Sequence, residues 1–150
     1  MKRFSFRLES YLRLCRHREE LEQVRLAELV TEAKRVRDTL ATLLEALKRT
    51  KDELGGRRTI RVYEVGWYRQ RIRGLQVQIE QTESQLANLQ DLVIQQRLRL
   101  IEARKKRKIV EKLRTNRLNQ HQRQVELELQ KQMDDLYLQR LHRNGDGTSS

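Results

Sequence analysis

The 150-residue sequence has no proline, six glycines and a single cysteine, Cys15. Because proline breaks helices and glycine weakens them, their absence or scarcity permits helices that continue for many turns. One cysteine cannot form an internal disulfide, and it cannot supply a zinc site of the two-cysteine, two-histidine kind. Apolar residues make up only 37% of the chain, so we do not expect a conventional globular core.

Long apolar runs are also missing. The opening "MKRFSFRLESYLRL" is interrupted by charges before it reaches the length of a signal peptide's apolar region. No later run approaches the length of a membrane-spanning helix. We therefore expect a soluble, cytoplasmic protein that reaches a membrane only through other proteins or through surface charge.

The residue clusters that carry enzyme chemistry are absent from the sequence. His17, His121 and His142 are far apart and have no carboxylate or cysteine group at metal-ligand spacing. The pair Gly55-Gly56 lacks the lysine and hydroxyl residue of a phosphate-binding loop, so we interpret it as a turn. The sequence predicts a protein that is not an enzyme and that needs no cofactor or metal.

Charge and periodicity are what the sequence has in abundance. It carries 33 basic and 21 acidic residues, a formal net charge of +12 that attracts acidic partners. Two apolar seams alternate steps of four and three residues, the 3.5-residue spacing of a coiled coil, and neither slips in phase. The first seam is Leu8, Leu12, Cys15, Glu19, Glu22, Leu26, Leu29, Ala33, Val36, Leu40, Leu43, Leu47, Thr50 and Leu54. The second is Ile72, Leu75, Ile79, Thr82, Leu86, Leu89, Val93, Gln96, Leu100 and Ala103.

The stretch between the seams, "GGRRTIRVYEVGWYRQ", mixes three glycines with β-branched and aromatic residues, and it predicts the tip of a helical hairpin. We predict an all-α fold, an antiparallel two-helix coiled coil formed by residues 1–143. Helix one covers about 4–54, the tip about 55–66 and helix two about 67–141, and residues 144–150 form a disordered tail. Each helix alone would leave its apolar stripe in water, so the two stripes pack together.

Charge suggests how the two seams are aligned. If facing residue numbers sum to about 126, Leu26 faces Leu100 and the seam acids Glu19 and Glu22 face Arg107 and Arg104. Shifts of seven or fourteen residues would leave these acids against apolar residues. We therefore predict that the two acid–base pairs fix the register. The same register leaves helix two uncovered beyond about residue 122, and an uncovered apolar stripe needs another chain.

Two segments of the sequence are distinctive: "FSFRLESYLRLCRHREELEQ" at the start and "KIVEKLRTNRLNQHQRQVELELQKQMDDLY" in the second helix. They resemble the corresponding segments of the flagellar FliJ family, and the resemblance covers almost the whole chain. Members of that family are small antiparallel coiled coils of the flagellar type III export apparatus, similar to the stalk of rotary ATPases. Injectisomes carry a related, YscO-type stalk protein.

The resemblance implies three partners: the hexameric export ATPase, the cytoplasmic domain of the membrane export gate, and export chaperones. It implies a cytoplasmic location at the inner membrane through protein contacts, and a chain that is monomeric on its own. It places ATPase contact on Leu129, Met133, Asp134, Leu136 and Arg140. It places gate contact on Trp67, Tyr68, Ile72 and Leu75.

Two other functions stay open at the level of sequence. Ten basic and two acidic residues lie between Arg99 and Arg123, which would suit a nucleic-acid-binding coiled coil. Against specific recognition, Asn116 follows the basic run instead of preceding a clean dimer seam, and this stretch has no aromatic residues to stack on bases. The third possibility is a scaffold coiled coil that dimerises through its uncovered tail.

Overall fold

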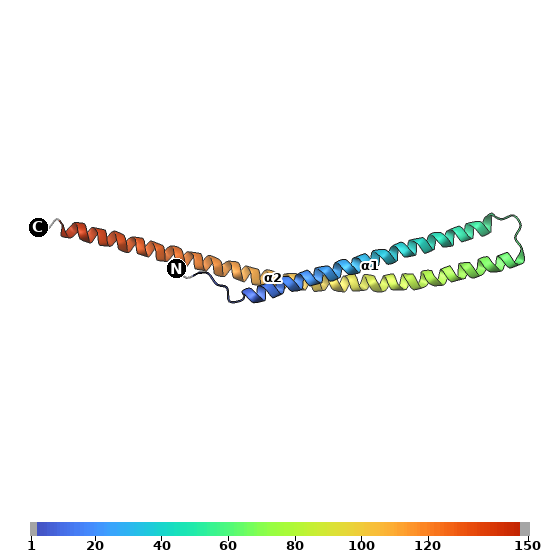
Figure 1. The fold of residues 1–150 in the computed structure, drawn as a ribbon, viewed down its shortest axis with the longest axis horizontal. Helices are drawn as coiled ribbons and strands as arrows, with labels where there is room; N and C mark the ends of the chain where they lie inside the picture. Colours follow the sequence, from blue (N-terminus) through green and yellow to red (C-terminus); the bar gives the residue numbers. More distant parts are fainter. Residues whose placement is uncertain (1–2, 148–150) are drawn as a thin grey trace. The chain divides into compact units, whose positions relative to one another are not determined.

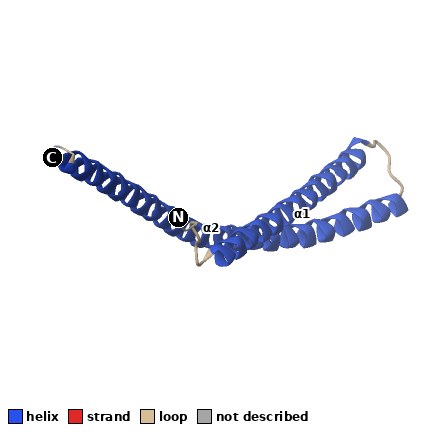
Figure 2. Cartoon of the chain, turned by 60° about the vertical axis from the view of Figure 1, so that its left-hand side comes forward, coloured by secondary structure: helices blue, strands red, loops and turns tan. Residues whose placement is uncertain are grey.

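The chain folds into two helices, shown in Figure 1, in a computed structural model that describes residues 3–147. Helix α1 spans Glu9–Gly56 and helix α2 spans Val62–Asp146. The rest of residues 3–147 is loop and contains no strand, as Figure 2 shows. The two helices pack against each other, which confirms the predicted all-α hairpin with an overhanging second helix.

The residues of the hairpin fall into two compact units. The first, which we call the terminal unit, comprises Met1–His17 and Arg104–Ser150. The second, the tip unit, comprises Arg18–Ala103. Each unit pairs a segment of α1 with a segment of α2, and each has its own buried residues.

The core of the tip unit follows the predicted seams. Its buried residues are Ala33, Val36, Thr50, Tyr68, Ile79, Val93, Gln96 and Leu100. All but Tyr68 are predicted seam positions, so the 3.5-residue spacing identified the buried face of both helices. The buried hydroxyl of Thr50 donates to the Ala46 carbonyl at 2.8 Å, so this polar seam residue is satisfied within its own helix.

The core of the terminal unit is a cluster of Leu12, Cys15 and Val110, with Phe6 packed against it. Leu12 has no exposed surface and Cys15 is 3% exposed. Cys15 is therefore a small buried seam residue. Its thiol is reduced and packs as an apolar group.

The start of α1 differs from the sequence prediction, because the helix begins at Glu9 and not near Phe4. The Glu9 amide donates to the Phe6 carbonyl at 3.1 Å, which closes a turn ahead of the helix. This turn allows the Phe6 side chain to reach the terminal-unit core. Burial of an aromatic ring thus outweighs the helical preference of the flanking residues.

The tip is also shorter than predicted, since only residues 57–61 separate the two helices. Gly55 and Gly56 lie in the last turn of α1, and no glycine among the described residues has a positive φ. Helix α2 begins at Val62, where the Arg61 carbonyl accepts the amides of Glu64 and Val65. Most of the aromatic and β-branched residues expected in the tip therefore form the first turns of α2, and only Thr59 and Ile60 remain in the loop.

At its other end α2 extends to Asp146, beyond the predicted limit near residue 141. Residues 144–146, predicted to be disordered, are helical, and Gly147 forms a turn. The remainder of the predicted tail, residues 148–150, lies outside the described residues. Within residues 3–147, neither helix is both long enough and apolar enough to cross a membrane.

Candidate partner interface

The C-terminal part of α2 is uncovered. Upstream, the helix is half-buried at a regular spacing, at Glu111, Arg114, Leu118, His121 and Val125. From residue 126 to residue 147 every position is exposed. We call residues 126–147 the tail segment, and it begins close to where the sequence placed the overhang.

One face of the tail segment continues the packed face of α2. With 3.6 residues per turn, Leu129, Met133 and Leu136 follow Val125 on a single stripe. Leu129 is 41% exposed, Met133 70% and Leu136 60%. Arg140 lies one turn further on this stripe. Four of the five residues that the sequence assigned to ATPase contact therefore share one exposed face.

Asp134 lies on a different face, because it follows Met133 by a rotation of about 100°. Leu127 precedes Asp134 by seven residues, and Leu138 and Leu141 follow it by four and seven. These three leucines share its face of the helix and are also exposed. The sequence prediction did not include this second stripe, because it rested on the continuation of the buried seam. Residues 127, 131, 134, 138 and 141 follow one another in steps of four and three, and this spacing could have predicted the stripe. Lys131 and Asp134 interrupt its apolar character.

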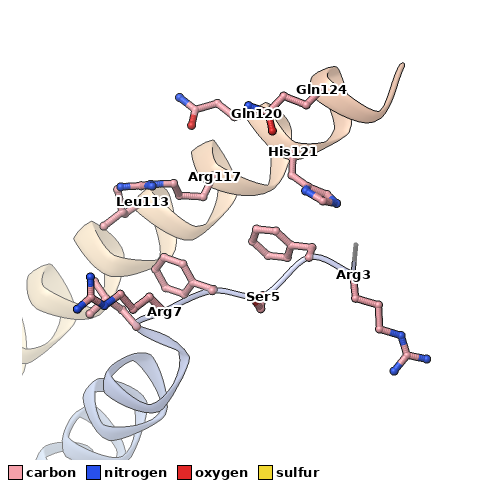
Figure 3. Close-up of a pocket in the computed structure, with 11 residues that line it drawn as sticks. Arg3, Ser5, Arg7, Leu113, Arg117, Gln120, His121 and Gln124 are labelled. Carbon is pink, nitrogen blue, oxygen red and sulfur yellow. The ribbon is translucent and has the colours of Figure 1, made fainter. Parts of the chain in front are cut away.

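An extended N-terminal strap, residues 3–8, lies against α2 ahead of the tail segment (Figure 3). The Phe4 ring lies 5.7 Å from the His121 ring, and Figure 3 shows His121 pointing from α2 toward the strap. The Arg114 guanidinium lies 5.8 Å from the Phe4 ring centre, while Arg114 Nε is 2.9 Å from Glu9 Oε2. The strap thus covers α2 through an aromatic pair and a cation–π contact, and it leaves the tail segment open.

The residues predicted for gate contact differ in exposure. Trp67 is 54% exposed and packs edge-on against Tyr68, with ring centres 5.0 Å apart. Tyr68 is buried, whereas Ile72 and Leu75 are half-buried seam residues. Arg71 lies 5.8 Å above the Trp67 ring. Trp67 is thus the residue of the four that presents most of its surface.

The base of the tip holds this aromatic pair in place. The Arg57 guanidinium lies 5.6 Å from the Tyr68 ring centre, and Arg57 Nη1 is 3.1 Å from Glu64 Oε2. These contacts tie the loop after α1 to the first turns of α2. They explain why Trp67 has a fixed support although it is itself exposed.

The four seam residues predicted to set the register, Glu19, Glu22, Arg104 and Arg107, are all half-buried. In the tip unit, the Glu22 carboxylate accepts from the Gln96 amide and lies 3.4 Å from Arg25 Nη1. In the terminal unit, Arg107 Nη1 lies 2.6 Å from Glu111 Oε2. The predicted pairs Glu19–Arg107 and Glu22–Arg104 each join the two units, and they stay predictions.

Contacts within each unit connect α1 with α2 near the predicted facing positions, with one exception in the tip unit. There Gln96 Nε2 also donates to the Glu22 carbonyl at 3.1 Å, whereas the predicted register places Gln96 opposite Val30. In the terminal unit, Val110 packs with Leu12 and Cys15, and Arg16 Nη2 lies 3.3 Å from Glu111 Oε1. Glu22 thus has a seam amide as a partner within its own unit, and the register set by charge stays a prediction.

Within residues 3–147, no group of three His, Cys, Asp or Glu side chains is placed to hold a metal ion. The arrangement of exposed apolar stripes on helices is that of a binding surface.

A family model described as "Flagellar FliJ protein" matches residues 4–146 of the chain. No curated protein and no solved structure matches it. The match spans both helices, the strap and the tail segment. The chain therefore belongs to the FliJ family, a family of non-enzymatic components of the apparatus for flagellar protein export.

Proposed function

We propose that this chain is the stalk of the flagellar export apparatus, which binds the hexameric export ATPase through its tail segment. Its other contacts are with the cytoplasmic domain of the membrane export gate, near Trp67, and with export chaperones. It works at the cytoplasmic face of the inner membrane through these protein contacts, as a single chain and without chemistry of its own.

The exposed stripe of Leu129, Met133 and Leu136 is the observation that carries the ATPase contact. It continues the face on which α2 is half-buried at Leu118 and Val125, but it has no covering segment among residues 3–147. The fold of the chain itself does not explain why this uniformly exposed helix carries large apolar side chains. They fit a helix whose apolar stripe is buried when another protein packs against that face.

Binding of this kind can regulate an ATPase ring by favouring one arrangement of its subunits. A single helix has no six-fold symmetry, so it touches the six subunits of a hexameric ring unequally. A ligand shifts a conformational equilibrium only by its difference in affinity between the states. A stalk that touches the subunits unequally can bind one arrangement of the ring more tightly than another. Ring assembly and ATP hydrolysis would both respond to this difference in affinity.

The gate contact is supported by Trp67, which is exposed and held by Tyr68 and Arg71. Tryptophan is the residue type most enriched among energetically dominant interface positions. Tyr68 is buried in the same place, so its role in this proposal is to support Trp67.

The test is the ATP hydrolysis rate of the cognate export ATPase, titrated with the chain at physiological salt. We expect saturable stimulation by the unaltered chain. The double variant Met133→Asp and Leu136→Asp places two charges in the proposed contact, and it should weaken the apparent affinity by at least roughly tenfold.

The matched control is Leu127→Asp and Leu138→Asp, which adds the same two charges to the opposite stripe of the tail segment. This control should stimulate like the unaltered chain. Equal loss in both double variants would assign the effect to net charge or to loss of helix. No stimulation and no ring binding by the unaltered chain would contradict the proposed function.

A further inference from the structure

An open groove lies along one side of the tip unit, at residues that neither the ATPase contact nor the gate contact uses. Its floor is apolar and consists of Val30 and Ala33 from α1 with Val93 and Ile94 from α2. Val30 is 43% exposed and Ile94 is 56% exposed, so the floor remains open to solvent in the free chain.

On α2, exposed isoleucines lie on the groove side. Ile101 follows Ile94 by seven residues on the groove side of α2 and is 45% exposed. On the opposite side of the same part of α2, the residues are Gln81, Gln85, Asn88, Leu92, Gln95, Arg99 and Glu102. All but Leu92 are polar. The groove side carries Gln90 and Arg97 as well as Ile94 and Ile101, so its exposed apolar residues lie among polar ones, as on a surface that suits an amphipathic partner.

The apolar residues on this side have the spacing of a helix-packing surface. Ile94, Leu98 and Ile101 are related by steps of four and three along α2, and Leu98 is 59% exposed. Of these three residues, Ile94 lines the groove together with Val30 of α1. A third helix laid into a groove between two others buries such a stripe, as in three-helix packing.

Charge selects the kind of helix that fits. The groove is flanked by Lys34, Arg37 and Arg97, against a single acid, Asp38. A second copy presenting the same groove would bring like-charged rims together, which disfavours that pairing. A helix with Glu and Asp beside its apolar stripe would meet the basic rim with opposite charge.

We infer that this groove docks an acidic amphipathic helix of another protein, which forms a third helix against the tip unit. This contact attaches a partner at residues that are distant in sequence from the ATPase-binding tail segment. It does not require the proposed ATPase contact to exist.

The probe is a labelled synthetic helix of about four turns, with leucines along one stripe and glutamates beside it. Its binding to the full chain is followed by fluorescence anisotropy at physiological salt. The variant Val30→Ser with Ile94→Ser removes the apolar floor and should weaken binding by at least roughly tenfold. Arg37→Glu with Arg97→Glu should reverse the preference, so that a matched peptide with lysines in place of glutamates binds better.

The control variant is Leu21→Ser with Leu92→Ser. Both residues are similarly exposed, at 43% and 46%, and each lies on the opposite side of its helix from the groove residue that it matches. This control should bind the peptide like the unaltered chain, and circular dichroism should show equal helix content in all variants.

Three outcomes would overturn the inference. The first is equal loss of peptide binding in the floor variant and in the control. The second is equal affinity of the unaltered chain for the acidic and the basic peptide. The third is concentration-dependent self-association, measured by sedimentation, that Val30→Ser with Ile94→Ser abolishes, since this would assign the groove to a second copy of the chain.

Discussion

Leu12 is fully buried in the terminal unit, among Cys15, Val110 and Phe6. Three of these four residues come from the first two turns of α1 or from the strap before it. The cluster therefore fastens the start of the chain to α2. Its stability rests on few side chains, so each of them contributes a large share.

Leu12→Ala should lower the free energy of unfolding by about 2–5 kcal/mol, because it removes a fully buried side chain and leaves a cavity. Chemical denaturation followed by circular dichroism measures this change. Leu14→Ala is the control, since Leu14 is 42% exposed and its truncation should cost less than about 0.5 kcal/mol. Equal effects of the two substitutions would contradict the assigned core.

At the residue scale, sequence predicted which residues are buried far better than which residues contact each other across the fold. Cys15 was assigned to the seam from its spacing alone, and it is 3% exposed. Tyr68 was not predicted to be buried, because it lies one seam step before Ile72, where the predicted second seam begins. The contact of Phe4 with His121 joins residues distant in sequence, and no local pattern of spacing or charge indicates it.

The start of α2 shows how tertiary contacts decide where a helix begins. The segment from Val62 to Tyr68 is rich in β-branched and aromatic residues, which are poor helix formers. Burial of Tyr68, together with the Arg57–Glu64 ion pair, favours a helix there. Glu64 in the first turn also interacts favourably with the helix dipole. The sequence predicted that this helix exists but not where it begins.

Gly74 offers a test of helix energetics within α2. It lies in the helix interior, its φ is not positive, and a methyl group added there would meet no atom within 4 Å. Gly74→Ala should therefore raise the free energy of unfolding by about 1 kcal/mol, since alanine restricts the unfolded chain and favours the helix.

The measurement for Gly74→Ala is the midpoint of chemical denaturation, with Gly74→Ser as a comparison that should stabilise less. A decrease in stability for the alanine variant would show that the small residue is needed for a close contact at this position. That result would conflict with the open space around Gly74.

The helical seams were the most predictable elements. Steps of four and three residues located nearly all the buried positions of both helices, because burial along a helix pair follows the 3.5-residue period regardless of the partner's details. The spacing does not by itself determine the register. Several alignments bury the same seam, and particular contacts such as Gln96 with Glu22 contribute to the choice between them.

Across the whole molecule, the net charge of +12 acts without a specific site. Lys105, Lys108 and Lys112 are all exposed on α2, within the basic stretch that suggested nucleic-acid binding. A basic surface attracts phosphate groups, and this attraction falls steeply as salt rises. Attraction alone does not distinguish a nucleic-acid-binding protein from a basic stalk.

We expect the chain to bind duplex DNA weakly at low salt and to lose at least roughly tenfold in affinity between about 50 and 200 mM salt. Anisotropy of a labelled duplex measures both. Changing Lys105, Lys108 and Lys112 to Glu should weaken binding no more than the same changes at Lys34, Lys48 and Lys51. If the changes at Lys105, Lys108 and Lys112 weakened DNA binding much more than those at the other three lysines, the result would favour a nucleic-acid-binding function.

The tail segment has a further property that follows from its exposure at every position. Little burial against the rest of the described chain holds it helical, so its order depends largely on its own helix propensity and on continuity with the packed part of α2. A partner that binds it must also hold it in one conformation. Substitutions at tail-segment residues that touch no partner can therefore change the binding affinity, because they change how well the segment is ordered as a helix.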